Sequence, residues 1–260
     1  MLLVVDVGNT NTVLGVYRED SLLHSWRIGT DKTRTDDECA MLVNDLLTYR
    51  GLAMADVTAV IVSCVVPPVL NALVRMCRSY FSAEPYVVSA GMKTGMAIAY
   101  DNPQEVGADR IVNAVAAYRK HQCSLIVVDF GTATTFDYIC ENGCYQGGAI
   151  APGLGISADA LHARASKLPR VALELPPQVV ARNTVHSIQS GMMFGYAGLV
   201  DGIVNRMKQE VGGTPKVVAT GGLAGPIAEV STTIDEVDPL LTLDGLRLIY
   251  QLNQHHNEDG

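Results

Sequence analysis

Two segments of the sequence place a carboxylate directly before a glycine turn rich in hydroxyl and amide side chains. One segment reads LLVVDVGNTNT over residues 2–12, and the other reads LIVVDFGTATT over residues 125–135. In each, an aspartate (Asp6 or Asp129) ends an apolar run. Backbone amides of such a turn can bind phosphate oxygens while the carboxylate holds a metal ion beside them. One copy alone is more often ordinary turn chemistry, but two copies predict a phosphate site.

A third glycine turn, ATGG over residues 219–222, joins an apolar strand to helical residues. A nucleotide can lie against backbone that lacks side chains, although a tight strand-to-helix connection is the competing interpretation. No GxxxxGK[ST] motif occurs in the chain, which disfavours a Walker-type site. The stretch GLGISA at 153–158 imitates a dinucleotide fingerprint, but Pro152 interrupts its entry and no repeating βαβ pattern surrounds it.

The segment GADRIVNA at 107–114 adds a second kind of chemistry. Asp109 and Arg110 lie at the start of an expected helix, where the helix dipole favours carboxylate charge. An ionised Asp109 could accept a proton from a substrate hydroxyl, and Arg110 offers a planar fork suited to a carboxylate. From the residues alone, a first-turn helix charge, a neighbouring ion pair and a solvated face are competing explanations.

The elements that position these residues follow the same order after each aspartate. Three predicted strands come first, and helices that alternate with strands come next. The first half is expected to contain strands at 2–5, 13–17, 22–28, 57–64 and 86–89, with helices after the TDDE capping box at 35–38 and after Pro67-Pro68. The second half is expected to contain strands at 125–129, 134–140, 146–151 and 216–219, with helices at 156–165, from Asn183 or Thr184, and from Gly222.

The two aspartates are 123 residues apart, which is close to half of the 260 residues. This internal repeat predicts a mixed α/β protein built from two related halves with a cleft between them. We expect domains at 1–121 and 122–260.

Composition excludes several classes of protein. The chain is 48% hydrophobic and carries a net charge of −8 with acidic residues spread along it, so binding to nucleic acid or an anionic membrane through bulk charge is not expected. No apolar run approaches the ~20 residues that a membrane span needs, and no secretory signal is evident. The six cysteines have no CxxC spacing and are typical of reduced thiols in a cytoplasmic protein.

Together, the segments DVGNT (6–10), DFGTATT (129–135) and ATGG (219–222) resemble the two phosphate segments and the adenosine segment of the actin, sugar kinase and heat-shock ATPase superfamily. Within it, the chain resembles the type III pantothenate kinases over nearly its whole length. Further resembling stretches are GADRIVNA (107–114), GGAIAPG (147–153) and TVHSIQSG (184–191). The resemblance implies an α/β fold of two ribonuclease H-like (actin-like ATPase) domains, with mixed sheets flanked by helices and an active cleft between them.

The resemblance also implies an activity: phosphorylation of pantothenate by ATP, the first step of coenzyme A synthesis. It makes Asp109 the catalytic residue that orients or deprotonates the substrate hydroxyl. The residues implied for pantothenate are Tyr100, Gly107, Ala108, Asp109, Arg110 and Thr184, the last from its own or a neighbouring subunit. Taken alone, Tyr100 is more simply a packed aromatic and Thr184 a helix N-cap.

For ATP, the resemblance implies a set of residues in both glycine turns: Asp6, Val7, Gly8, Asn9, Thr10, Asn11, Thr12, Val13 and Thr132. Asp6 is expected to act through Mg²⁺ or its waters on the nucleotide phosphates. Asp129 is expected to hold a monovalent cation, K⁺ or NH₄⁺. For Asn9, Thr10 and Thr12, simple hydrogen bonding within the turn is the competing explanation.

Four glycines, Gly191, Gly195, Gly198 and Gly202, fall on one side of the long helix expected after Asn183. Glycine weakens a helix by up to ~1 kcal/mol relative to alanine, so such a stripe implies a closely approaching neighbour. Packing within the chain and contact between two subunits both explain it, and the resemblance favours a homodimer. Two alternative functions remain: another small-molecule kinase of the superfamily, or a non-catalytic nucleotide-binding regulator.

Overall fold

The contacts within the chain divide it into two compact units in a computed structural model that describes residues 1–89 and 91–254. Unit 1 comprises Met1–Met96, Asp101–Ala116 and the C-terminal helix α7 (Leu241–Gln254). Unit 2 comprises Ala97–Tyr100 and Ala117–Leu240. The chain therefore passes between the units more than once, and each unit is assembled from separate stretches of sequence.

Unit 1 is built on a five-stranded sheet with the order β3-β2-β1-β4-β5. The strands β1, β2 and β3 are antiparallel to their neighbours, whereas β4 and β5 run parallel to β1. Apolar residues of β1, β2 and β4 are buried because helices cover both faces of the sheet. The strands span Leu2–Val7 (β1), Asn11–Arg18 (β2), Ser21–Gly29 (β3), Ala59–Cys64 (β4) and Tyr86–Val87 (β5).

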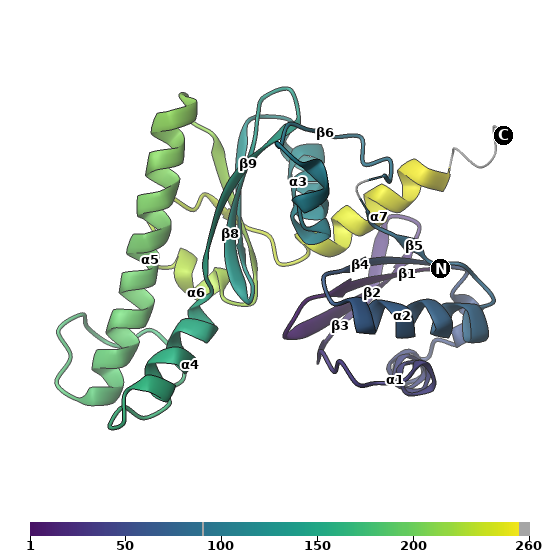
Figure 1. Cartoon of the computed structure of the whole chain (residues 1–260), viewed down its shortest axis with the longest axis horizontal. Helices are drawn as coiled ribbons and strands as arrows, with labels where there is room; N and C mark the ends of the chain where they lie inside the picture. The colour runs from purple at the N-terminus through teal and green to yellow at the C-terminus, as the bar shows by residue number, and fades with distance from the viewer. Residues whose placement is uncertain (90, 255–260) are drawn as a thin grey trace. The chain divides into compact units, whose positions relative to one another are not determined.

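Helices α1 (Asp36–Tyr49) and α2 (Pro67–Met76) lie on one face of this sheet, and α7 lies on the other (Figure 1). The predicted capping box is present, because the Thr35 hydroxyl accepts from the Glu38 amide and the Glu38 carboxylate accepts from the Thr35 amide. Proline opens α2 as predicted. Short helical turns, η1 (Met54–Asp56), η2 (Cys77–Phe81) and η3 (Pro103–Glu105), complete the unit.

Unit 2 repeats the topology of unit 1. Its sheet has the order β11-β10-β7-β8-β9-β6, in which β7 to β11 occupy the places that β1 to β5 occupy in unit 1. β7 pairs antiparallel with β8 and parallel with β10, as β1 pairs with β2 and β4. The strands span Ala97–Ile98 (β6), Leu125–Phe130 (β7), Ala133–Ile139 (β8), Cys144–Pro152 (β9), Lys216–Gly221 (β10) and Glu236–Val237 (β11). The two related halves predicted from the repeat are therefore present.

The 28-residue helix α5 (Thr184–Val211) packs on one face of the second sheet. Its buried stripe includes Met193, Tyr196 and Val200, which belong to one hydrophobic core with Phe136 and Val128 of the strands. The shorter helices α4 (Leu154–Arg164) and α6 (Ala224–Ala228) join this layer (Figure 1). The helix α3 (Ala108–His121) begins in unit 1 and ends in unit 2.

The structure confirms the predicted class, a mixed α/β fold with two sheets flanked by helices. It differs from the prediction at the C-terminus, where α7 contacts the first sheet rather than the second. Apolar residues at helical spacing, Leu243, Leu246 and Tyr250, bury this helix in unit 1. The boundary between residues 121 and 122 and the cleft between the halves stay predictions. Within the described residues, no helix is long and apolar enough to cross a membrane.

Candidate active site

The first glycine turn connects β1 to β2 in unit 1 and presents its polar residues to solvent. Asp6 is half-buried near the end of β1, and the Gly8 amide donates to the Asn11 carbonyl oxygen at 3.0 Å, which closes the turn. The side chains of Asn9, Thr10 and Asn11 are exposed, so a phosphate group can approach this turn. The phosphate site that the sequence predicts at this turn stays a prediction.

Three predicted nucleotide residues of the same segment, Val7, Thr12 and Val13, are wholly or partly buried. Thr12 is only 7% exposed, and its hydroxyl shares a 2.9 Å hydrogen bond with the Thr30 hydroxyl. Thr30 in turn donates to the Gly8 carbonyl oxygen at 2.8 Å. Val7 is buried in the core and Val13 is half-buried. The Thr12 hydroxyl therefore has a partner within the protein, and the assignment of Thr12, Val7 and Val13 to ATP stays a prediction.

The GADR segment forms the start of α3. The Asp109 carboxylate folds back, so that its Oδ1 accepts from the Arg110 amide at 2.8 Å. A β-carbon on Gly107 would lie 2.5 Å from the same oxygen, so this position must be glycine for the carboxylate to adopt its place. Ala108 is the first helical residue, and the Ile111 amide donates to the Gly107 carbonyl oxygen.

Burial sets the electrostatics of this carboxyl group. The pKa of Asp109 is raised above its usual value because burial penalises the charged form, and this outweighs the lowering by the Arg110 amide and the Arg110 charge. Arg110 is itself only 6% exposed. Carboxyl groups with a shifted pKa are frequent at functional sites.

In unit 2, Asp129 occupies the position in β7 that Asp6 occupies in β1. The two strands have the same pattern of buried residues, and each aspartate is half-buried before the last residue. The Gly131 amide donates to the Ala133 carbonyl oxygen at 3.1 Å, and Thr132 is half-buried in the turn. The second turn therefore resembles the first but is one residue shorter, since Phe130 pairs with Thr134 whereas Val7 pairs with Thr12.

Two other glycine motifs converge on this second turn. A β-carbon on Gly221 would lie 2.7 Å from Asp129 Oδ1 and 2.7 Å from the Phe130 carbonyl oxygen. A β-carbon on Gly153 would lie 2.1 Å from the Thr132 carbonyl oxygen. The predicted segments DFGT, ATGG and APG are thus in contact, although they are distant in the sequence.

Asp129 Oδ1 and the Phe130 carbonyl oxygen both lie close to Gly221. Carboxylate and carbonyl oxygens are partners that K⁺ and NH₄⁺ prefer, and a monovalent cation at Asp129 stays a prediction. No group of three or more His, Cys, Asp or Glu side chains suited to a metal occurs in the described part of the chain. A cation at Asp129, or Mg²⁺ at Asp6, would therefore depend on one carboxylate together with backbone or substrate oxygens.

The two remaining residues predicted to bind pantothenate, Tyr100 and Thr184, lie in different parts of unit 2. Tyr100 follows β6 and packs its ring against Gly147 of β9, 6.3 Å from the ring centre of Tyr145. Thr184 is exposed at the first turn of α5, where Asn183 rather than Thr184 is the N-cap. The predicted capping role of Thr184 is therefore wrong, because the Asn183 side chain accepts from the His186 amide.

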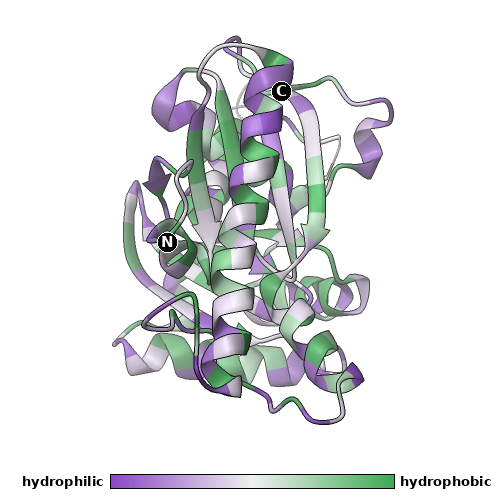
Figure 2. Cartoon of the chain, turned by 90° about the vertical axis from the view of Figure 1, so that its left-hand side faces the viewer, coloured by the Kyte–Doolittle hydropathy of each residue, from purple (hydrophilic) through white to green (hydrophobic). Residues whose placement is uncertain are grey.

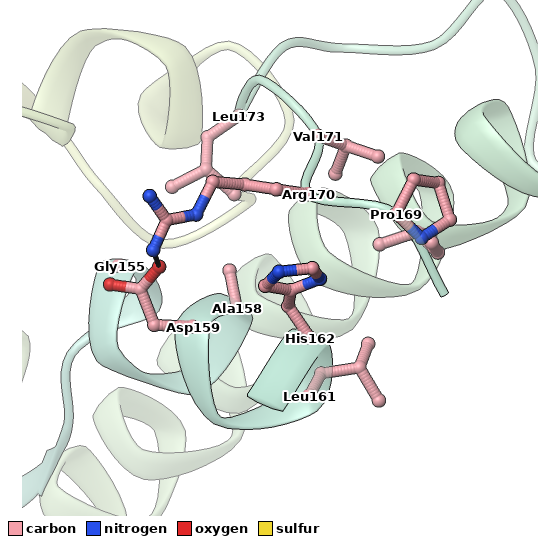
Figure 3. Close-up of a pocket in the computed structure, with 10 residues that line it drawn as sticks. Gly155, Ala158, Asp159, Leu161, His162, Pro169, Arg170, Val171 and Leu173 are labelled. Atoms are coloured by element: carbon pink, nitrogen blue, oxygen red, sulfur yellow. Dashed lines mark hydrogen bonds and ion pairs between the residues drawn. The ribbon is translucent and has the colours of Figure 1, made fainter. Parts of the chain in front are cut away.

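Thr184 lines a cavity of about 680 Å³ between the end of α4, the segment before α5 and α5 itself, with Leu161, Arg182 and Ile188. A smaller neighbouring cavity of about 260 Å³ contains none of the predicted residues (Figure 3). There Arg170 pairs with Asp159 at 2.9 Å, and the two side chains point toward each other. Because both are well exposed, this pair contributes little energy and marks no site.

Sequence analysis missed a buried polar cluster on the face of the second sheet that carries Asp129. Asp137 is 1% exposed, and it accepts from the Tyr145 hydroxyl at 2.7 Å and from the Thr135 hydroxyl at 3.0 Å. Strand alternation places Asp129, opposite Thr135, on the same face as Asp137. The position of Asp137 inside a buried strand was the signal available in the sequence. An aspartate there is costly unless it accepts hydrogen bonds, so it predicts polar partners on the same face.

Comparison with known proteins agrees with this geometry. Residues 2–206 match the family model described as type III pantothenate kinase. The chain is 62% identical to the type III pantothenate kinase of Syntrophotalea carbinolica and 59% identical to that of Geotalea uraniireducens, in each case over 254 residues. These alignments cover 98% of this chain and 100% and 99% of the relatives.

Among solved structures, the ROK hexokinase of Thermus thermophilus has a similar fold, with a TM-score of 0.52 and 14% sequence identity over 100% of this chain and 99% of that one. This likeness supports the sugar kinase type of fold. The match to the family model and the identity to full-length relatives go further: the chain belongs to the family of type III pantothenate kinases.

Proposed function

We propose that this protein transfers the γ-phosphoryl group of ATP to the primary hydroxyl of pantothenate, which yields 4'-phosphopantothenate and begins coenzyme A synthesis. Membership of the family supports the substrates. The observation that carries the chemistry is the half-buried Asp109 carboxyl group, folded over Gly107 at the start of α3.

In this proposal the pantothenate hydroxyl donates its proton to Asp109. The hydroxyl oxygen forms a bond to the γ-phosphorus, the bond to the bridging oxygen breaks, and ADP leaves. Since phosphoryl transfer is largely dissociative, the carboxylate contributes more by orienting the hydroxyl than by its basicity. Its raised pKa nevertheless favours acceptance of the proton.

We assign to Arg110 the binding of the pantothenate carboxylate, because a guanidinium binds a carboxylate through two parallel hydrogen bonds. Gly107 and Ala108 bring backbone close to the substrate at the same helix start. Tyr100 and Thr184 complete the proposed pantothenate contacts. The exposure of Thr184 is compatible with contact to a ligand in its own or a partner subunit's site.

The ATP phosphates are assigned to the two glycine turns, with residues 6–13 in unit 1 and Thr132 in unit 2. Asp6 would hold Mg²⁺ directly or through water, and Asp129 would hold K⁺ or NH₄⁺. When bound, these cations offset the negative charge that two anionic substrates bring to a protein of net charge −8. The chain's own contribution is to fix both carboxylates beside glycine turns that carry backbone amides and hydroxyl side chains.

We also propose a homodimer that forms through α5. Gly191, Gly195, Gly198 and Gly202 are exposed, and a β-carbon on any of them would meet nothing within 4 Å in the described structure. Packing within the described chain therefore does not explain them. Figure 2 shows that the outward face of α5 is pale or hydrophobic over most of its length. A second copy of α5 could approach closely along this stripe.

Light scattering of purified protein tests the dimer. We expect two chains per particle, and one chain after replacement of Gly195 and Gly198 by leucine. Gly225→Leu is the matched control, because this glycine is also exposed in a helix with open space around it. A wild-type monomer, or an unchanged dimer in the double variant, would contradict the proposed interface.

We place the enzyme in the cytoplasm, where its substrates occur, and the six free cysteines agree with that compartment.

The catalytic proposal is tested by ADP release with a panel of acceptors, in potassium and in sodium buffer. Pantothenate should be the preferred acceptor, and potassium should increase its turnover. Preference for a sugar would favour another kinase activity, and ATP binding without any acceptor would favour a regulator. Indifference to the cation would remove only the role of Asp129.

A further inference from the structure

Residues 97–100 belong to unit 2, although the residues on either side of them belong to unit 1. They are attached to β9 by a two-residue parallel strand, in which Ala97 pairs with Cys144 and Ile98 with Tyr145. The Ala99 amide adds a hydrogen bond of 2.8 Å to the Tyr145 carbonyl oxygen. A pairing this short gives little rigidity by itself, so the position of the following Tyr100 needs further support.

Tyr145 supplies that support through its side chain as well as its backbone. Its ring is completely buried and lies 6.3 Å from the ring of Tyr100, tilted by 51°. Aromatic pairs at this separation are attractive beyond the area that they bury. The ring of Tyr100 also lies over Gly147, where a β-carbon would come within 3.5 Å of it.

An irregularity in β9 sets the direction of Tyr145. The pairing of β8 with β9 shifts at Tyr138 and Ile139, so that Gln146 has no partner and Gly147 takes a φ of +117°. Such bulges redirect side chains and are frequent beside functional sites. Tyr145 pairs with Ile139, yet its hydroxyl reaches the carboxylate of Asp137 two residues away on β8.

Asp137 fixes the Tyr145 hydroxyl. It is 1% exposed, and both of its carboxylate oxygens accept hydrogen bonds, from Tyr145 at 2.7 Å and from Thr135 at 3.0 Å. A hydrogen bond to a charged group is about twice as strong as a neutral one, and it constrains the ring that carries the hydroxyl. Packing alone would be satisfied by phenylalanine at position 145.

We propose that Asp137 and Tyr145 are positioning residues for pantothenate, which act by holding Tyr100 in place. This inference rests on the proposed function, in which Tyr100 contacts pantothenate. It assigns a role in substrate recognition to a buried carboxylate that the proposed phosphoryl transfer does not use.

Tyr145→Phe is the most direct variant, since it keeps the ring and removes the hydroxyl. We expect KM for pantothenate to rise about tenfold, the scale of a lost hydrogen bond to a charged group, while kcat and KM for ATP change less than about twofold. Tyr138→Phe is the matched control: it removes a hydroxyl from β8 on the opposite face, beside the core of α5, and should leave all three constants unchanged. Asp137→Asn, which keeps the side-chain shape, should raise the same KM.

A double-mutant cycle separates positioning from general stability. In a Tyr100→Ala background, Tyr145→Phe should raise KM for pantothenate no further, because the residue through which it acts is gone. An unchanged KM in Tyr145→Phe, equal losses for both substrates, or full additivity with Tyr100→Ala would each overturn the inference. A wild-type enzyme that does not phosphorylate pantothenate would instead refute the proposed function, and the inference with it.

Discussion

The carboxylate of Asp129 occupies the space that a side chain on Gly221 would need. Asp129 Oδ1 and the Phe130 carbonyl oxygen both lie 2.7 Å from the point where a β-carbon of residue 221 would stand. Gly221 also has a φ of +94°, which residues with side chains rarely adopt. The end of β10 and the end of β7 therefore fit together only because residue 221 is glycine.

Gly221→Ala should destabilise the protein by about 2–4 kcal/mol, since it combines backbone strain with a clash against backbone that cannot move away cheaply. Urea denaturation measures this loss. Gly225→Ala is the control, because its added methyl group enters open space in a helix and should be neutral or slightly stabilising. Equal stability of the two variants would contradict the described contact.

Gly107→Ala should separate activity from stability. The added methyl group would meet Asp109 Oδ1, the end of a flexible side chain, so the carboxylate can rotate away at little cost in folding energy. Because a displaced catalytic group loses its alignment, we expect kcat to fall about 100-fold while the unfolding free energy changes by less than about 1 kcal/mol. Normal kcat in a folded variant would show that the present position of the carboxylate is not the one used in catalysis.

Asp109→Asn tests the proton acceptor itself. The amide keeps the shape of the side chain but cannot accept the hydroxyl proton, so kcat should fall by about 10²- to 10⁴-fold. ATP binding, measured by calorimetry, should be retained because Asp109 is not assigned to the nucleotide. Turnover close to that of the wild type would remove Asp109 from the mechanism.

The pH dependence of stability tests the burial of the same carboxyl group. Its raised folded-state pKa means that it contributes stability that is fully present below the usual pKa of 3.8 and is lost as the pH rises through the folded-state pKa. Asparagine does not ionise, so Asp109→Asn should have a higher Tm than the wild type at pH 7. The difference should vanish toward pH 3.8.

Asp101→Asn is the control for this stability measurement, because Asp101 is exposed and its replacement changes the net charge equally. The control should show no comparable rise in Tm at pH 7. A lower Tm for Asp109→Asn at pH 7, or a difference that does not depend on pH, would contradict the described burial.

Sequence patterns were sufficient to predict the strands that the two halves share. Asp6 and Asp129 each end a run of buried residues, and alternation of the following strands fixes which residues share a face. The capping box at Thr35 was also predictable, because it depends only on residues within one turn of the helix. Local chemistry of this kind determines local structure with little influence from the rest of the chain.

Long-range contacts were not predictable from the same patterns. The sequence of helix α7 has helical spacing, but nothing in it indicates that the helix packs on the first sheet. There the Tyr17 hydroxyl donates to Asp244 of α7, a residue 227 positions away in the sequence. The contact of Gly221 with Asp129 likewise depends on strand order, which a single sequence does not specify. The hydrogen bond between Thr12 and Thr30 was not predictable for a related reason, since Thr30 follows the far end of β3.

The identity of the phosphorylated product tests the central claim most directly. Purified protein should be incubated with ATP, Mg²⁺, K⁺ and pantothenate, and its products followed by mass spectrometry together with ADP. The proposed function predicts 4'-phosphopantothenate and ADP in equal amounts, with neither formed above background when pantothenate is omitted. ADP that does not depend on pantothenate, or an absence of the phosphorylated product in an enzyme that binds ATP, would contradict it.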